Sequence, residues 1–141
     1  MLDRYKKTGG FVQLLMLIET SSASKRDKFL EIIESEGLLE NARILGAYAK
    51  GALEGLGSPL IKEVRGVGLM IGIEFVEDFS SRIKLKDDRA PSLLMVNLLH
   101  VAGLLTVPSG THAIRWLPPL NVSRGEIDEA VGILAGVLTG L

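Results

Sequence analysis

Apolar residues recur at helical spacing in four stretches of the chain, and the first lies near the N-terminus. It predicts a helix over about residues 25–36, because Ser24 can cap it and Asp27, three positions on, completes an approximate capping box. Gly37 ends or kinks this helix. We expect its apolar stripe to be buried; the stripe consists of Phe29, Leu30, Ile32 and Ile33.

A second helix is predicted over about residues 38–56, where a turn signal from Gly57 to Pro59 stops it. The apolar positions at helical spacing are Leu38, Ala42, Leu45, Ala49, Ala52 and Leu56. A helix of this length with one apolar face is typical of an element packed against a domain core.

Two more helices are predicted in the second half of the chain. One covers about residues 91–102, with Pro91 in its first turn and Gly103 closing it. The last begins at Ser123, whose capping box is completed by Glu126. The buried face of this last helix is expected to comprise Ile127, Ala130, Val131, Leu134, Val137 and Leu138.

Between the helices the apolar residues alternate, which favours strands. Residues 61–75 are predicted as a strand with one packed face and one face nearly free of side chains, because glycines alternate with large apolar residues. Residues 77–88 are polar and predicted as an exposed loop. Two short strands, 104–107 and 113–117, are expected to pair around a turn at 108–110.

This order of elements predicts an α/β (α+β) fold in which helices cover a small mixed or antiparallel sheet. We expect a domain over residues 25–141, preceded by a divergent N-terminal segment and linker over residues 1–24. That segment holds an apolar run, 11–18, interrupted by Gln13. The run is short for a signal peptide, and we expect it to pack on the domain.

Composition excludes several classes of function. The 141 residues include no cysteine, so a disulfide scaffold, a thiolate metal site and a cysteine nucleophile are excluded, and a cytoplasmic protein is expected. A net charge of −1 gives no footprint for nucleic acid, and no apolar run is long enough to span a membrane. His100 and His112 have no ligand or triad partners at suitable spacing, so no metal site is predicted.

Three glycines, Gly66, Gly68 and Gly72, superficially resemble a dinucleotide-binding loop. The fingerprint requires a strand before the glycines and a helix after them, whereas here a strand follows and the third glycine is one residue late. A bulged strand, or one approached closely by another backbone, is the better interpretation.

Arg115 is the best candidate for a ligand contact. It stands among apolar residues at the end of a predicted strand, where burial without an anion is costly, and its planar fork suits a carboxylate or a phosphate. The alternative is an arginine paired with an acidic residue, or one whose head reaches water. Trp116 points to the opposite face of the strand, and the pattern does not decide which face is the core.

Four segments, taken together and in order, resemble the class III pyridoxal-phosphate aminotransferases, especially those that act on acetylornithine. They are residues 31–42, residues 64–74, residues 103–110 and the Arg115 segment, followed by a helix through 127–130. The resemblance covers roughly residues 28–139. It implies the small C-terminal domain of a fold-type I aminotransferase.

The resemblance further implies that Arg115 binds the α-carboxylate of the substrate, in a family that transfers an amino group between acetylornithine and 2-oxoglutarate on pyridoxal phosphate. The implied partners are an amino acid or keto acid, and a second copy of the chain or a large-domain partner. The family's Schiff-base lysine, its aspartate facing the pyridine nitrogen and its phosphate-binding residues have no counterpart here; Lys50 falls in a predicted helix.

We therefore expect a fragment, a degenerate copy or a separately made domain that is catalytically incomplete alone. No catalytic, cofactor-binding or metal-binding residue is assigned, and Arg115 is the single substrate-binding residue. The alternative is a stand-alone module that binds an amino acid or keto acid, or a structural remnant without catalysis.

Overall fold

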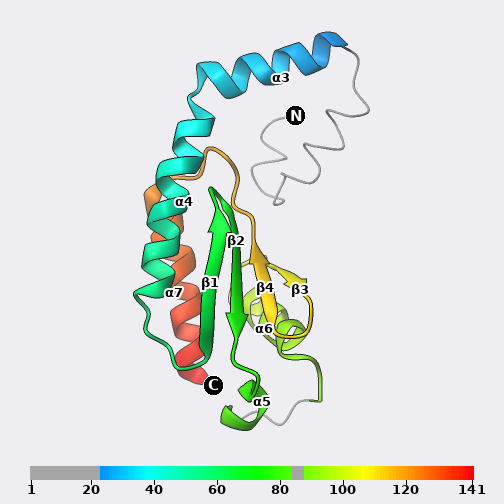
Figure 1. Cartoon of the computed structure of the whole chain (residues 1–141), viewed down its shortest axis with the longest axis vertical. Coiled ribbons are helices and arrows are strands. Elements are labelled where there is room, and N and C mark those ends of the chain that lie inside the picture. The colour runs from blue at the N-terminus through cyan, green and yellow to red at the C-terminus, as the bar shows by residue number, and fades with distance from the viewer. Residues whose placement is uncertain (1–22, 84–87) are drawn as a thin grey trace.

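The computed structural model describes residues 23–83 and 88–141 (Figure 1). The predicted N-terminal segment therefore falls almost entirely outside the described residues. The elements are α3 (Ala23–Ser35), α4 (Leu38–Glu54), β1 (Ile61–Val67), β2 (Met70–Phe75), α5 (Phe79–Arg82), α6 (Pro91–Val101), β3 (Val107–Ser109), β4 (Ala113–Trp116) and α7 (Arg124–Gly140). Among these, no helix is long and apolar enough to cross a membrane.

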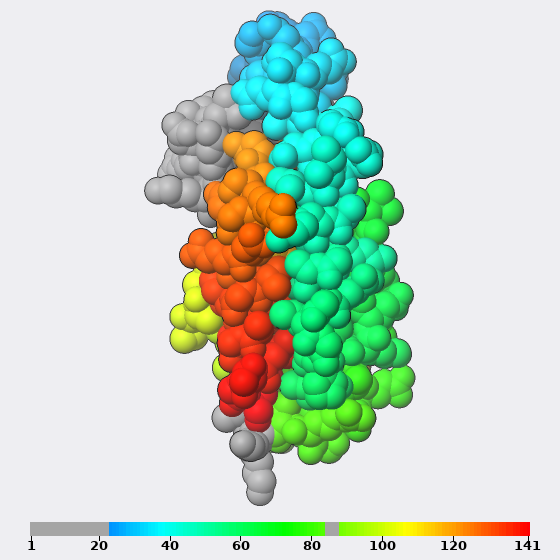
Figure 2. Space-filling model, turned by 90° about the vertical axis from the view of Figure 1, so that its left-hand side faces the viewer, coloured from blue at the N-terminus to red at the C-terminus, as the bar shows by residue number. Residues whose placement is uncertain are grey.

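The four strands form one antiparallel sheet in the order β1-β2-β4-β3, which confirms the predicted fold class. Helices α4 and α7 run side by side along one face of the sheet (Figures 1 and 2). Helix α6 contacts β3, β4 and α7. The core between sheet and helices is built around buried side chains of Ile71, Ile73, Phe75, Ile114, Trp116, Leu53, Met95, Ile127 and Leu134.

The prediction of a single strand over 61–75 was wrong, because the chain reverses at Gly68 and Leu69 to form a hairpin. Val64 pairs with Ile73, and both face the core, as do the other odd-numbered residues of β2, Ile71 and Phe75. In β1 a register shift between Ile61 and Glu63 interrupts the alternation. The odd residues of β2 follow the predicted pattern, but Val67 is 89% exposed. A two-residue turn inside a run of alternating apolar and small residues hardly changes the two-residue periodicity, so the sequence pattern does not reveal it.

The predicted close approach of another backbone is confirmed at the hairpin tip. A Cβ on Gly46 of α4 would overlap the carbonyl oxygen of Gly68, and Gly68 itself has a φ of 54°. A Cβ on Gly66 would likewise overlap the carbonyl oxygen of Met70. Gly46 and Gly68 therefore allow helix α4 and the hairpin tip to meet backbone to backbone, and Gly66 allows the two strands of the hairpin to approach closely at its tip.

The strand predicted over 104–107 lies further along the chain. It is β3, which includes Pro108, and the chain turns at residues 110–112 instead of 108–110. A proline is tolerated there because β3 is an edge strand and needs no N–H donor on its free side. The predicted pairing with the 113–117 strand is confirmed, since β3 pairs with β4 from Val107 to Ser109.

Helices α4, α6 and α7 lie where the sequence predicts them. Gly37 has a φ of 62° between α3 and α4, and Gly103 has a φ of 97° after α6. At α7 the Ser123 side chain accepts a hydrogen bond from the Glu126 backbone N–H, while the Glu126 carboxylate accepts one from the Ser123 N–H. The predicted capping box is therefore confirmed.

Two expectations about the chain's periphery were wrong. No residue of α3 is buried, and Leu30 of its predicted stripe is 56% exposed, because α3 extends beyond the sheet and packs mainly against α4 (Figure 1). Ser24 lies inside α3, not before it. The predicted loop over 77–88 contains the short helix α5, whose Phe79 is fully buried against Phe75.

Candidate functional site

Arg115 lies in the middle of the sheet, on the face opposite the helices. Its neighbours Ile114 and Trp116 are buried in the core, which settles that Trp116 belongs to the core and Arg115 to the outer face. Gly72 is the register partner of Arg115 on β2, and Val107 is its partner on β3. Paired strands on both sides hold the Arg115 backbone in place.

The Arg115 side chain is exposed, so it does not carry the cost of burial that the sequence suggested. Its Nη2 donates a hydrogen bond to Ser109 Oγ at 3.3 Å. Among the described residues no carboxylate lies within ion-pair distance of it. Of the two alternatives considered for a structural arginine, the structure therefore favours the one whose head reaches water.

Gly72 makes the outer face of the sheet shallow beside Arg115. Because it has no side chain, the aliphatic part of Arg65 lies across it, with Arg65 Cγ 3.6 Å from where a Cβ would stand. Arg65 and Arg115 thus flank Gly72 in one row across β1, β2 and β4. The Arg65 side chain therefore occupies the space over Gly72, and Arg115 stands beside it on β4.

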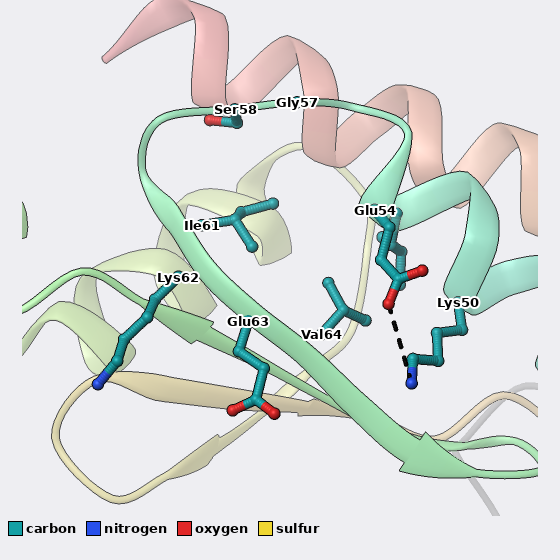
Figure 3. A pocket seen from close by; sticks show the side chains of 9 residues that line it. Lys50, Glu54, Gly57, Ser58, Ile61, Lys62, Glu63 and Val64 are labelled. Carbon is teal, nitrogen blue, oxygen red and sulfur yellow. Dashed lines mark ion pairs between the residues drawn. The ribbon is translucent and has the colours of Figure 1, made fainter.

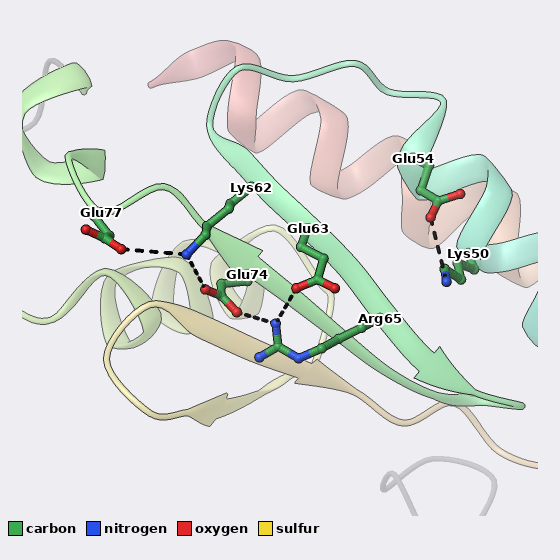
Figure 4. Close-up of polar contacts among 7 residues, drawn as sticks. All are labelled: Lys50, Glu54, Lys62, Glu63, Arg65, Glu74 and Glu77. Carbon is green, nitrogen blue, oxygen red and sulfur yellow. Dashed lines mark hydrogen bonds and ion pairs between the residues drawn. The ribbon is translucent and has the colours of Figure 1, made fainter.

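Of these two guanidinium groups, Arg65 alone is neutralised by residues in the described part of the chain. Arg65 pairs with Glu74 and, at 3.1 Å, with Glu63, while Lys62 pairs with Glu74 at 3.0 Å and Glu77 at 3.6 Å (Figure 4). Hydrogen bonds from Arg65 and Lys62 lower the pKa of the Glu74 carboxyl. The hydrogen bond to Glu74 in turn raises the pKa of the Lys62 ammonium. Arg115 stands outside this network in the described part of the chain.

A polar cavity of about 430 Å³ lies between the end of α4 and strand β1 (Figure 3). Its charged residues are Lys50, Glu54, Lys62 and Glu63. Lys50 and Glu54 lie 3.8 Å apart, and Lys62 is held by Glu74, so the positive groups already have carboxylate neighbours. This cavity therefore offers no free charge for a ligand.

Asn41 is a positioning residue that sequence reasoning missed. Its Nδ2 donates to the carbonyl oxygens of Leu120 at 2.7 Å and Val122 at 3.1 Å. These carbonyls belong to the segment that follows β4, so Asn41 ties the chain just beyond Arg115 to helix α4. The one available signal was its place in segment 31–42, which carries the family resemblance without an assigned role.

The two histidines lie apart from this face of the sheet. His100 is exposed near the end of α6, and His112 is half-buried in the turn before β4. In the described ranges no three His, Cys, Asp or Glu residues come together in a way that could hold a metal ion.

Comparisons with known proteins identify the family. Residues 21–138 match the model of the aminotransferase class-III family. The chain is 39% identical over 106 residues to the acetylornithine aminotransferase of Bacillus subtilis, covering 74% of this chain and 24% of that protein. It is 36% identical over 112 residues to the ornithine aminotransferase of the same organism, covering 77% of this chain and 24% of that protein.

Solved structures agree with the sequence relatives. The crystal structure of acetylornithine aminotransferase from Elizabethkingia anophelis superposes with a TM-score of 0.68 at 26% identity, covering 79% of this chain and 28% of that one. The chain spans about a quarter of the length of the curated relatives that it matches. Because the family model covers most of its residues, the chain belongs to the class III aminotransferases.

Proposed function

We propose that this chain supplies the substrate-carboxylate part of a class III aminotransferase site, with Arg115 as the residue that binds the carboxylate. The observation that carries the proposal is an exposed guanidinium, fixed on a doubly paired strand and without a carboxylate partner among the described residues. The relatives named for acetylornithine and ornithine point to an amino acid of that type. The family resemblance of the sequence implies 2-oxoglutarate as the amino acceptor.

The chemistry of the arginine supports this role. A guanidinium donates two parallel hydrogen bonds to one carboxylate, which fixes the orientation of the substrate as well as its position. Such orientation matters in a transaminase because the reacting amine must meet the cofactor in a defined geometry. Ser109 and the Asn41 contact limit the movement of Arg115 and of the chain beyond it.

The described residues do not fit pyridoxal phosphate by themselves. The cofactor needs a lysine that is a free amine in an enclosed site. Lys50 and Lys62 are both partly exposed and lie beside carboxylates, and the pKa of Lys62 is raised, which keeps its ammonium protonated. Lys25 and Lys28 are exposed on α3, and Lys28 is paired with Glu31. These lysines therefore offer no site at which the cofactor could be held covalently.

The proposal places this chain as a small C-terminal domain. The cofactor-binding part would come from a large domain, on a longer chain or on a partner, including a second copy of a longer chain. On this reading the chain is catalytically incomplete alone. In the parent family, pyridoxal phosphate supplies the electron sink for amino transfer when it is bound.

A second candidate is a stand-alone module that binds an amino acid or keto acid, and the lack of a carboxylate partner for Arg115 among the described residues favours it. Titration of the full chain with acetylornithine and with 2-oxoglutarate by calorimetry tests both candidates. We expect weak binding that falls by about 10- to 100-fold in Arg115→Ala, because charge-assisted hydrogen bonds contribute about 1.5–3 kcal/mol. Arg82→Ala, on α5 and paired with Asp78, is the matched control.

Arg115→Lys sharpens the result, because lysine keeps the charge but loses the planar fork. We expect an affinity between those of the wild-type chain and Arg115→Ala. Equal affinity of Arg115→Ala and wild-type chain would contradict the assigned role of Arg115, and equal losses in Arg115→Ala and Arg82→Ala would show a non-specific effect of charge.

A further inference from the structure

An apolar groove of about 510 Å³ lies at the tip of the β1–β2 hairpin. Its walls come from the hairpin, from helix α4 and from the segment after β4, and none of its lining residues carries a charge. The side chains that give it its character are Ala42, Val67, Met70, Leu117, Pro118 and Leu120. Val67 is 89% exposed and Met70 is 49% exposed, so the groove presents apolar surface to water.

The walls of this groove are held in place from two sides. The hairpin tip rests against α4 through the contact between Gly46 and Gly68. The segment after β4 is tied to the same helix by the hydrogen bonds from Asn41 to Leu120 and Val122. Both walls are thus anchored on α4, and the groove is a fixed feature of the fold.

Apolar surface of this kind generally has a partner, because leaving it in water is unfavourable. Its volume lies within the range of about 300–1,000 Å³ typical of pockets that bind organic ligands. A charged ligand would find no counter-charge among the lining residues. The occupant should therefore be apolar.

The chain itself holds a segment that meets this requirement. Residues 11–18 form an uncharged run of eight residues in which Gln13 is the single polar side chain. The family match begins at residue 21, so this run lies outside the sequence shared with the aminotransferases. The run is therefore a feature of this chain and not of the matched family region.

The run is also close enough in sequence to reach the groove. Even if α3 and α4 were collinear, the 19 residue steps from Ala23 to Ala42 would span only about 28 Å, and the bend at Gly37 shortens this distance. An extended chain covers roughly 17 Å from Ala23 back to Ile18 and roughly 40 Å back to Phe11. The groove lies within this interval.

We propose that residues 11–18 bind in the apolar groove at the hairpin tip and cover Val67 and Met70 within the same chain. This contact is independent of Arg115 and of carboxylate binding. It would make the N-terminal run an intramolecular cover for a surface that the matched family region leaves exposed in this structure.

Because the chain contains no cysteine, a disulfide between two introduced cysteines can be detected without competing thiols. The full chain carrying Leu15→Cys and Met70→Cys is oxidised in a glutathione buffer and compared with the matched pair Leu15→Cys and Val101→Cys. Val101, on α6, is 91% exposed and does not line the groove. We expect the first pair to form an intramolecular disulfide at least about tenfold more readily, because a docked segment raises the effective concentration of its thiol.

Equal yields for the two pairs would overturn the proposal. A disulfide that forms between chains in the first pair, seen as a covalent dimer without reductant, would overturn it in favour of a second copy in the groove. If the cysteine variants fold poorly, limited proteolysis of Val67→Lys and Val101→Lys provides a second test. We expect faster cleavage within residues 1–22 for Val67→Lys alone, and equal cleavage would also contradict the proposal.

Discussion

On the helix-covered face of the sheet, Ile71, Ile73 and Trp116 are at most 5% exposed, whereas on the opposite face Arg65, Arg115 and Met70 reach water. The two sets alternate along the same strands, so one residue step separates core from surface. The inner face is apolar and continuous with α4, α6 and α7. The outer face carries an ion-pair network and the Arg115 guanidinium, which has no carboxylate partner among the described residues, so stability and binding chemistry are assigned to different faces.

Ile73→Ala tests the inner face where it is most tightly packed. Ile73 is 2% exposed in the centre of the core, and its truncation should lower the free energy of unfolding by about 2–4 kcal/mol through lost burial and the cavity left behind. Urea denaturation followed by circular dichroism measures this. A loss well below 1 kcal/mol would break the comparison, because the inner face would then contribute no more than the surface.

Gly46→Ala tests the contact between α4 and the hairpin tip. The added methyl group would overlap the carbonyl oxygen of Gly68, so we expect destabilisation of about 1–3 kcal/mol despite the better helix propensity of alanine. Gly51→Ala, in the same helix with open space around it, is the control and should stabilise by a few tenths to about 1 kcal/mol. Equal effects of the two substitutions would show that the close contact has no energetic role.

Ser123→Ala removes the cap of α7, a surface feature that holds an inner-face helix. We expect a loss of about 1 kcal/mol. Hydrogen bonds from the Ser123 backbone N–H and hydroxyl lower the pKa of Glu126, so this stabilisation is present above the unfolded pKa of about 4.3 and is lost as the pH falls through the lower folded pKa. Thermal melts at pH 7 and pH 3 should show that the effect of Ser123→Ala shrinks in acid.

Glu74→Gln should have the smallest effect on unfolding, because Glu74 belongs to exposed ion pairs on the outer face. The pKa of Glu74 is lowered by Arg65 first and Lys62 second, so its contribution is present at neutral pH and disappears as the pH falls through that lowered value. Denaturation at low and high salt is the measurement. A loss comparable to that of Ile73→Ala would erase the distinction between the two faces.

The sequence predicts elements well where local chemistry defines them, as α7 and α3 show together. The capping box and apolar stripe of α7 predict its start and its core residues, because a partner surface is present. The stripe of α3 is equally regular, yet none of it is buried, since periodicity reports a face and not the element that covers it. Periodicity also fails to reveal the turn at Gly68, because apolar and small residues continue to alternate through the turn.

For the candidate site, too, the sequence predicts some features and not others. The sequence singles out Arg115 because a lone cation among apolar residues is unusual, but its exposure depends on which face the helices cover. The Asn41 contact joins residues 79 and 81 positions apart, and no local pattern predicts so distant a pairing. The groove at the hairpin tip likewise exists only where three separate segments meet.

We propose that this chain holds the substrate-carboxylate half of an aminotransferase site without a cofactor site of its own. The most direct measurement is incubation of the full chain with pyridoxal phosphate, borohydride reduction and peptide mapping, with acetylornithine and 2-oxoglutarate turnover assayed alongside. We predict scattered, substoichiometric lysine labelling and no turnover. One lysine labelled stoichiometrically, together with turnover, would contradict the claim and would mean that the chain builds a complete site.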